Sequence, residues 1–232
     1  MWSAGPVRPA PEGGRPGALR TGLRLAPGLR VGLFGGSFNP AHPGHAHVAE
    51  TALRRLRLQR VVWLVSPQNP LKSSRETAPM AARLAGARRL ARGPGMVVSD
   101  VEARLGTRYT LDTLRVLKAR HPGVRFVWIM GGDSLDGFHR WRGWAQILRT
   151  VPVAVVARPG GLGRARFAPA ARRFAAARVP SRAAATLSGR QPPAWCWLDA
   201  RLHPASSTAL RAGALTPAGP SSASPPARRG PG

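Results

Sequence analysis

Residues 35–45 read Gly-Gly-Ser-Phe-Asn-Pro-Ala-His-Pro-Gly-His, and this stretch decides the fold. A short apolar run at residues 30–34 precedes it, and a helical pattern begins near residue 44. A strand, a glycine turn and a helix start in this order are typical of a phosphate site, because the first turn of a helix offers free N–H groups and a positive dipole end. Gly35 and Gly36 have no Cβ, and we expect the backbone to approach a ligand closely at these two positions.

Two histidines, His42 and His45, lie three residues apart where the chain turns into this helix. Their imidazoles can point into one small volume, donate to phosphate oxygens and change charge near neutral pH. Histidines at this spacing also occur in metal sites, but zinc needs a third and a fourth ligand. The remaining candidates have no spacing that completes such a set: His121, His139, His203 and Cys196. The dinucleotide fingerprint G-x-G-x-x-G is not present either.

Length and composition limit the class of protein. A chain of 232 residues with 43% hydrophobic residues suits one α/β domain with extensions. No run of about 18 apolar residues occurs, so we expect no membrane span. A single cysteine fits a reducing compartment, and we expect a cytoplasmic protein.

The formal charge of +27 raises the alternative of a nucleic-acid-binding protein. Only two of the 36 basic residues are lysine, and the arginines are scattered rather than clustered with aromatic residues. This bias, together with abundant Gly, Pro and Ala, indicates a GC-rich genome more than a nucleic-acid partner. We therefore expect no specific nucleic acid, although a basic surface helps to capture anionic nucleotides.

The chain divides into three parts by composition. We expect residues 1–28 to form a disordered Pro/Gly/Arg-rich extension, residues 29–212 to form one domain, and residues 213–232 to form a disordered tail. The first part resembles a transit peptide, but a misassigned start codon or a plain extension explains it equally well.

Strand-like and helical patterns alternate through the middle part. Continuous apolar runs suit buried parallel strands, and alternation with helices predicts a Rossmann-like α/β domain, a parallel sheet with helices on both faces. Ligands of such folds bind beyond the carboxyl ends of the strands. The expected strands are 30–34, 61–65, 96–98, 125–130, 151–156 and 195–198, and the expected helices are 44–57, 79–91, 109–120, 141–148 and 166–178.

The opening stretch resembles the signature of the nucleotidylyltransferase superfamily, G-x-F-[DN]-P-x-H-x-G-H. The matching residues are Gly36, Phe38, Asn39, Pro40, His42, Gly44 and His45. From about residue 30 to 212 the chain is similar to bacterial nicotinate-mononucleotide adenylyltransferases. This resemblance implies transfer of an adenylyl group from ATP to nicotinate mononucleotide, by direct attack of the mononucleotide phosphate on the α-phosphorus.

The resemblance also implies residues for the nicotinate nucleotide. Arg108-Tyr109-Thr110 resembles the family segment S-Y-T, whose backbone amides hold the nicotinate carboxylate, and Phe138-His139-Arg140-Trp141 resembles F-x-x-W, whose tryptophan stacks on the ring. Lys72 ends a loop, residues 66–72, that lies near the phosphates in the family. Simpler readings stay open: Thr110 as a helix cap, Trp141 as a core residue and Lys72 as a solvated side chain.

For ATP, the resemblance implies the glycine turn and three later segments. Asp133 lies in a G-x-D-S-L-like segment, Arg158 in R-P-G, and Arg211 ends a string that resembles I-S-[ST]-[ST]-x-[IL]-R. A capping role for Asp133 and a surface role for Arg158 stay open. The predicted ATP-binding residues are Gly35, Gly36, Ser37, Phe38, Asp133, Arg158, Ser206, Ser207 and Thr208, and the predicted catalytic residues are His42, His45 and Arg211.

The implied chemistry needs alignment and charge stabilisation rather than a strong base. Mg²⁺ is expected to bind mainly through the ATP phosphates, with no protein ligand. Ala205 replaces the usual isoleucine, and the chain continues into Pro/Ser-rich sequence, which leaves a homo-oligomer open. The alternatives are another adenylyltransferase, with nicotinamide mononucleotide or phosphopantetheine as acceptor, a cytidylyltransferase, or a basic nucleic-acid-binding protein.

Overall fold

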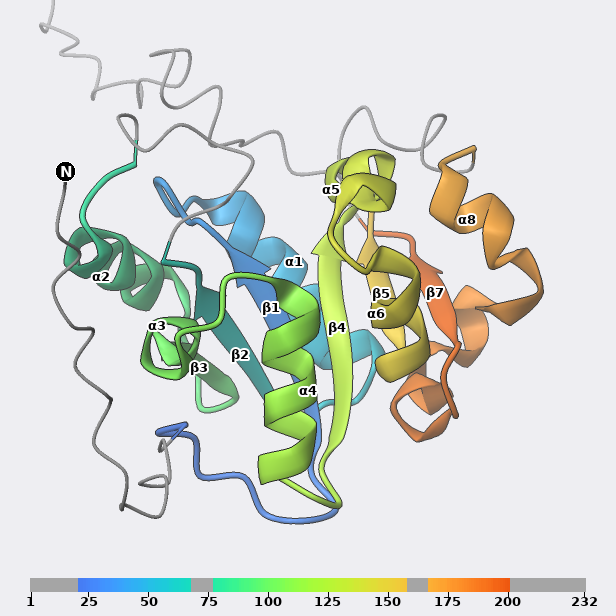
Figure 1. The fold of residues 1–232 in the computed structure, drawn as a ribbon, viewed down its shortest axis with the longest axis horizontal. Helices are drawn as coiled ribbons and strands as arrows, with labels where there is room; N and C mark the ends of the chain where they lie inside the picture. The colour runs from blue at the N-terminus through green and yellow to red at the C-terminus, as the bar shows by residue number, and fades with distance from the viewer. Residues whose placement is uncertain (1–20, 68–76, 158–166, 201–232) are drawn as a thin grey trace, which may run out of the picture.

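Strands and helices alternate through the residues that the computed structural model describes, 21–67, 77–157 and 167–200 (Figure 1). The strands are β1 (Arg30–Gly36), β2 (Arg60–Val65), β3 (Met96–Ser99), β4 (Arg125–Gly131), β5 (Val153–Val156), β6 (Arg178–Val179) and β7 (Trp195–Leu198). The α-helices are α1 (Pro43–Arg55), α2 (Met80–Leu90), α3 (Val101–Leu105), α4 (Thr110–Arg120), α5 (Gly132–Gly137), α6 (Trp144–Thr150) and α8 (Pro169–Arg173). Short 3₁₀ helices are η2 (Phe138–Arg140), η3 (Ala175–Ala177) and η4 (Ser181–Gly189).

The seven strands of the described ranges form one sheet in the order β3-β2-β1-β4-β5-β7-β6, and every pair of neighbours is parallel. In the register, Leu33 of β1 lies opposite Val62 of β2 and Trp128 of β4. The central strands are apolar along almost their whole length because both of their faces are covered. The predicted parallel α/β sheet is confirmed.

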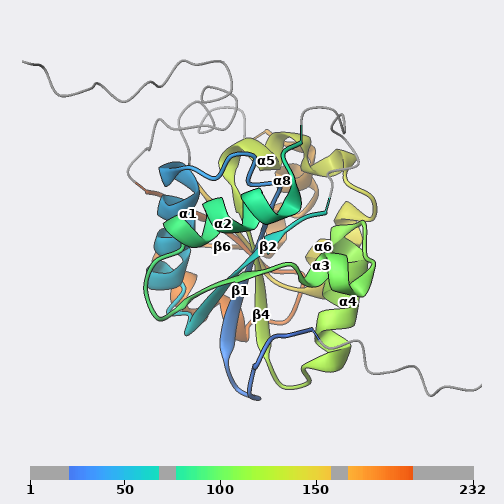
Figure 2. The ribbon, with the colours of Figure 1, turned by 90° about the vertical axis from the view of Figure 1, so that its left-hand side faces the viewer.

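Helices cover both faces, as the side view shows (Figure 2). On one face, α3, α4, α6 and α8 bury apolar side chains such as Val101, Leu114 and Ile147 against the sheet. On the other face, α1, α2 and η4 bury Val48, Ala87 and Leu187, among others. The molecule is therefore a three-layer domain with a buried sheet.

The centre of the sheet contains a topological switch point. From β1 the chain adds β2 and β3 outward on one side, and β4 then pairs with the opposite edge of β1. The carboxyl ends of β1 and β4, Gly36 and Gly131, thus lie on neighbouring strands. In open α/β sheets, the crevice beyond such a pair of strand ends is where ligands bind.

The glycines of β1 have a packing reason that the sequence did not reveal. The strand continues through Gly35 and Gly36 instead of ending at residue 34. A Cβ on Gly35 would lie 2.3 Å from Cη2 of Trp128, and a Cβ on Gly36 would lie 3.0 Å from the ring of Phe38. Gly35 therefore makes room for an indole on the neighbouring strand, whatever it contributes to ligand binding.

Other expected elements also have different bounds, and the helix expected at 141–148 begins at Trp144. The strand expected at 151–156 begins at Val153, because Pro152 has no N–H to donate to the sheet. The helix expected at 166–178 is broken into α8, η3 and the short strand β6. The short helices α3 and α5 were not expected.

The first described residues, 21–28, lie within the extension assigned from composition, yet they contact the domain. Thr21 and Leu23 are buried, and the Thr21 hydroxyl lies 3.0 Å from Nε2 of His121. The domain limits at 29 and 212 stay a prediction. No helix in ranges 21–67, 77–157 or 167–200 is long and apolar enough to span a bilayer.

Candidate functional site

The histidine pair forms the start of α1, at the carboxyl end of β1. His42 is the N-cap residue, and Pro43 and His45 occupy the first turn. The backbone N–H of His42 donates to Nδ1 of His45 at 3.2 Å, and the N–H of His45 donates to the carbonyl of His42 at 2.8 Å. The two ring centroids are 3.7 Å apart. The expectation that both imidazoles occupy one small volume agrees with this geometry.

This cap selects the tautomer of His45. Because Nδ1 accepts a hydrogen bond from backbone, the neutral ring must carry its proton on Nε2. An Nε2–H is a hydrogen-bond donor, which is what a phosphate oxygen needs. His45 is half-buried whereas His42 is only 1% exposed, so His45 is the more accessible of the two.

Phe38 packs its ring against His45 of the histidine pair. Its backbone has φ +46°, its side chain is buried, and its ring contacts those of Phe34, Trp63 and His45, the last at 5.0 Å between centroids. The side chain is therefore part of the packing that orients His45. A contact of Phe38 with ATP would have to come from its backbone.

Arg83, on α2, adjoins the candidate site and was not predicted from the sequence. Its side chain is 4% exposed, and its guanidinium donates to the carbonyls of Ser37, Ser66, Pro67 and Ala78 at 2.6–2.9 Å. Burial lowers the pKa of this arginine, but a guanidinium stays charged at any physiological pH. Arg83 thus ties the loop after β1 to the loop after β2 and places a buried positive charge beneath the turn to the histidines.

A second group of predicted residues gathers at the start of α4. Tyr109 is its N-cap residue, and the first helix-internal bonds run from Asp112 and Thr113 to the Tyr109 carbonyl. The N–H groups ahead of Asp112 have no acceptor within the helix. As at any helix start, they can therefore bind an acceptor from outside the helix. The guanidinium of Arg142 lies 4.5 Å from the centre of the Tyr109 ring, so this helix start and the Trp141 segment adjoin.

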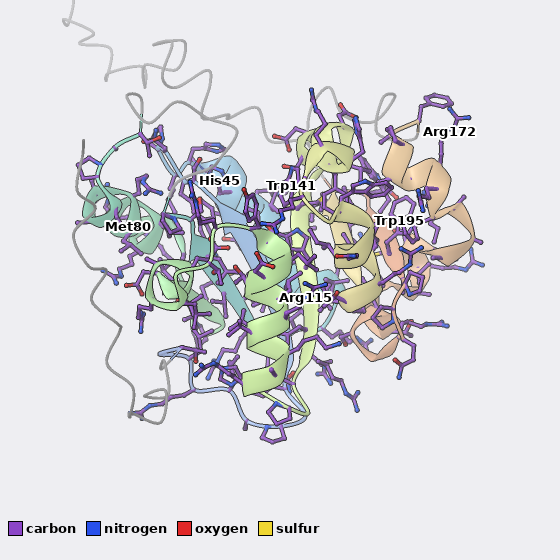
Figure 3. The ribbon with its side chains drawn as sticks, in the orientation of Figure 1. His45, Met80, Arg115, Trp141, Arg172 and Trp195 are labelled. Carbon is purple, nitrogen blue, oxygen red and sulfur yellow. The ribbon has the colours of Figure 1, made fainter. Side chains whose placement is uncertain are left out.

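Trp141 is only partly buried, and its neighbours are aromatic. Its ring meets those of Phe138 and Trp128 edge to face, at 5.3 and 6.3 Å between centroids. Trp144, in contrast, packs between Phe138 and Phe174. Figure 3 labels His45 and Trp141 toward the end of the sheet at which β1 and β4 finish. Their roles stay predictions.

Asp133 lies in the first turn of α5, directly beyond β4, with an exposed side chain. This places it just beyond β4, the strand that pairs with β1, at the predicted ligand edge. The remaining predicted site residues lie outside the described residues: Lys72, Arg158, Ser206, Ser207, Thr208 and Arg211.

Two further side chains, those of His47 and Cys196, add little to the candidate site. His47, which the spacing argument passed over, lies half-buried on α1. Burial raises the pKa of the Cys196 thiol to about 12, so this cysteine is not a nucleophile. Within the described ranges, no cluster of three or more His, Cys, Asp or Glu side chains could hold a metal ion.

Comparisons with known proteins agree with this architecture. The sequence model of the cytidylyltransferase-like family matches residues 33–213. The chain is 69% identical over 183 residues to a probable nicotinate-nucleotide adenylyltransferase of Caulobacter sp. (79% of this chain, 97% of the relative). It is 60% identical over 182 residues to one of Cereibacter sphaeroides (78% of this chain, 96% of the relative).

Among solved structures, the fold is similar to that of Plasmodium falciparum nicotinic acid mononucleotide adenylyltransferase complexed with NaAD. The TM-score is 0.62 at 14% identity, covering 79% of this chain and 83% of that one. At this identity the likeness shows the fold alone. The chain belongs to the cytidylyltransferase-like family and, within it, groups with the nicotinate-nucleotide adenylyltransferases. The resemblance drawn from the motifs is confirmed.

Proposed function

We propose that the chain transfers the adenylyl group of ATP to nicotinate mononucleotide, giving deamido-NAD and pyrophosphate for NAD biosynthesis. The observation that carries the proposal is the close histidine pair at the start of α1, with ring centroids 3.7 Å apart and Nδ1 of His45 accepting the backbone N–H of His42. The high identity to relatives named nicotinate-nucleotide adenylyltransferase supports the choice of substrates.

The reaction is an in-line displacement. An oxygen of the mononucleotide phosphate forms a bond to the α-phosphorus, and the bond from that phosphorus to the bridging oxygen of pyrophosphate breaks. The acceptor phosphate is already ionised, so no residue has to remove a proton. Catalysis then consists of alignment and of stabilising negative charge on the phosphoryl oxygens.

The ATP end of the crevice binds the triphosphate in this proposal. The N–H groups of α1, His42 and His45 receive the triphosphate, and the buried charge of Arg83 favours anions above it. Lys72, Arg158 and Arg211, together with the hydroxyls of Ser206, Ser207 and Thr208, remain proposed contributors. The protein is proposed to supply no ligand to Mg²⁺, which would be held mainly by ATP and would offset part of the triphosphate charge. Asp133 is the exposed carboxylate proposed to organise the ATP end.

The nicotinate end is assigned to the start of α4. The N–H groups of this helix start, next to Tyr109 and Thr110, receive the nicotinate carboxylate, and Trp141 stacks on the ring. A cytoplasmic location and a homo-oligomer stay predictions.

A pyrophosphate-release assay tests this function. With ATP and Mg²⁺ fixed, we expect rapid release with nicotinate mononucleotide, slower release with nicotinamide mononucleotide and none with phosphopantetheine. Preference for phosphopantetheine or for the amide nucleotide would assign the chain to another acceptor. DNA binding with no pyrophosphate release would favour the nucleic-acid alternative.

Replacing Trp141 by alanine tests the nicotinate end. Loss of ring stacking, about 0.5–1.5 kcal/mol, should raise KM for nicotinate mononucleotide by roughly two- to thirteenfold and leave KM for ATP unchanged. Trp144→Ala is the control, because Trp144 packs against Phe174 and should lower stability without a selective effect on the acceptor. Equal rises of KM for both substrates in both variants would contradict the stacking role.

A further inference from the structure

Glu102, on α3, is a carboxylate that the fold buries. Its side chain is 7% exposed, and α3 packs against the apolar strand β2. An isolated buried carboxylate is unfavourable unless it is neutral or well hydrogen-bonded. The proposed reaction makes no direct use of this group, yet its contacts lead to the start of α4.

A chain of hydroxyl groups joins Glu102 to Tyr109. The Thr113 hydroxyl lies 3.1 Å from Oε1 of Glu102, 2.8 Å from the Thr107 hydroxyl and 3.3 Å from the Tyr109 carbonyl. The backbone N–H of Thr107 donates to the Glu102 carbonyl at 3.0 Å. The loop from α3 to α4 is thus fastened to Glu102 by both backbone and side chain.

Counting protons favours a neutral carboxyl group. The Thr113 hydroxyl has three oxygen neighbours but only one proton to donate. With Glu102 ionised, Thr113 must donate to it, and the contact with the Tyr109 carbonyl has no hydrogen. With Glu102 protonated, its own O–H can donate to Thr113, Thr107 can donate to Thr113, and Thr113 can donate to Tyr109. The neutral form therefore satisfies every contact.

The electrostatic environment agrees with this count. Burial raises the pKa of Glu102 to about 7, and the Thr113 hydroxyl opposes the rise. On its own helix, Arg104 is paired with Asp100. Further charged or titratable groups lie at or beside the start of α4: Arg108, Tyr109, Asp112 and Arg142.

We propose that Glu102 is a positioning residue for the nicotinate end of the acceptor, acting as a neutral acid. In this form it holds Thr113 and Thr107 against the Tyr109 carbonyl and adds no negative charge behind the helix start that receives the nicotinate carboxylate. Ionisation loosens the network and repels that carboxylate, but has little effect on the uncharged amide of nicotinamide mononucleotide. This inference rests on the proposed function.

The test compares Glu102→Gln with the wild type from pH 6 to pH 8.5. Glutamine keeps an N–H donor toward Thr113 and cannot ionise. The ratio of variant to wild-type kcat/KM cancels the titration of substrates and of unrelated groups. For nicotinate mononucleotide the ratio should rise about fivefold or more with pH, the size expected for one unit charge across partly hydrated protein. For nicotinamide mononucleotide it should rise much less, and KM for ATP should not change.

Two further variants separate positioning from general stability. Glu50→Gln, the same change at an exposed position of α1, should give a flat ratio. Thr113→Val removes the hydroxyl but keeps the shape, and should raise KM for nicotinate mononucleotide while kcat changes little. If Glu102→Gln fails to fold, Thr113→Val measured over the same pH range still tests the network. Its KM for nicotinate mononucleotide should vary less with pH than that of the wild type, because only the charge repulsion from Glu102 remains.

Thermal unfolding gives a readout independent of activity. The folded protein holds the Glu102 proton more tightly than the unfolded chain, whose ordinary pKa is 4.5. Stability from this group is therefore complete below pH 4.5 and declines until the pH passes about 7. Glu102→Gln should lack this decline. A flat ratio for every substrate in an active enzyme would overturn the inference, whereas no turnover of nicotinate mononucleotide by the wild type would instead overturn the proposed function.

Discussion

His45→Ala lowers kcat by about 100- to 1,000-fold, the usual cost of losing one fixed donor to a charge that develops in the transition state. The proposed donor is Nε2–H, because Nδ1 accepts the His42 N–H. The cap bond is lost as well, so the free energy of unfolding should fall by only about 1 kcal/mol. Steady-state pyrophosphate release and urea denaturation measure the two effects. Near-normal turnover would show that His45 has no part in the transition state.

Two conservative variants separate the cap from the donor. In His45→Asn, the shorter amide side chain can still accept the His42 N–H but does not reach the position of Nε2, so the variant should be stable and nearly inactive. His45→Gln extends an amide toward the position of Nε2 and should retain more kcat than His45→Asn. The reverse order of activities would contradict the assignment of Nε2 as the donor.

Arg83→Met lowers the free energy of unfolding by about 3–5 kcal/mol and reduces kcat/KM for both substrates. The change leaves four carbonyls, those of Ser37, Ser66, Pro67 and Ala78, without their buried donor. It also removes a positive charge beneath the histidine turn. Urea denaturation and initial rates with each substrate varied in turn measure these losses.

Arg89→Met is the matched control, since Arg89 lies on the same helix with an exposed side chain. Its stability and kinetics should stay close to those of the wild type. Arg83→Lys keeps the charge, but an ammonium group cannot donate to all four carbonyls as the planar guanidinium does. This variant should therefore recover little of the lost stability and activity. An Arg83→Met variant as stable and active as Arg89→Met would show that the buried contacts contribute nothing.

The layers of the fold were predictable because the alternation of apolar runs and helical patterns is clear within short stretches of the sequence. Apolar runs such as 125–130 can only be buried strands when helical patterns alternate with them, and the observed sheet is parallel throughout. Pro152 marks the start of β5 in the sequence itself, although it was assigned to the strand. Helices as short as α3 and α5 contain too few residues to show a period.

The candidate site was predictable only where its residues are adjacent in the sequence. The glycine turn and the histidine pair lie within one stretch of chain, so their proximity follows from local geometry. Arg83 and Glu102 acquire their importance from partners far along the chain or across a loop. A signal for Arg83 was present, because it lies in helical register with Met80 and Ala87, on the side of α2 that faces the interior. For Glu102 the only signal was an acid in a chain with so few of them.

The uniform direction of the strands has a practical consequence. Since β1 to β5 all run the same way, the connections at 56–59, 91–95 and 121–124 lie at the end of the sheet opposite the crevice. A dye, an affinity handle or a surface tether attached to these turns leaves the mouth of the crevice open. These turns are therefore the places at which to attach labels for single-molecule work or for immobilising the enzyme.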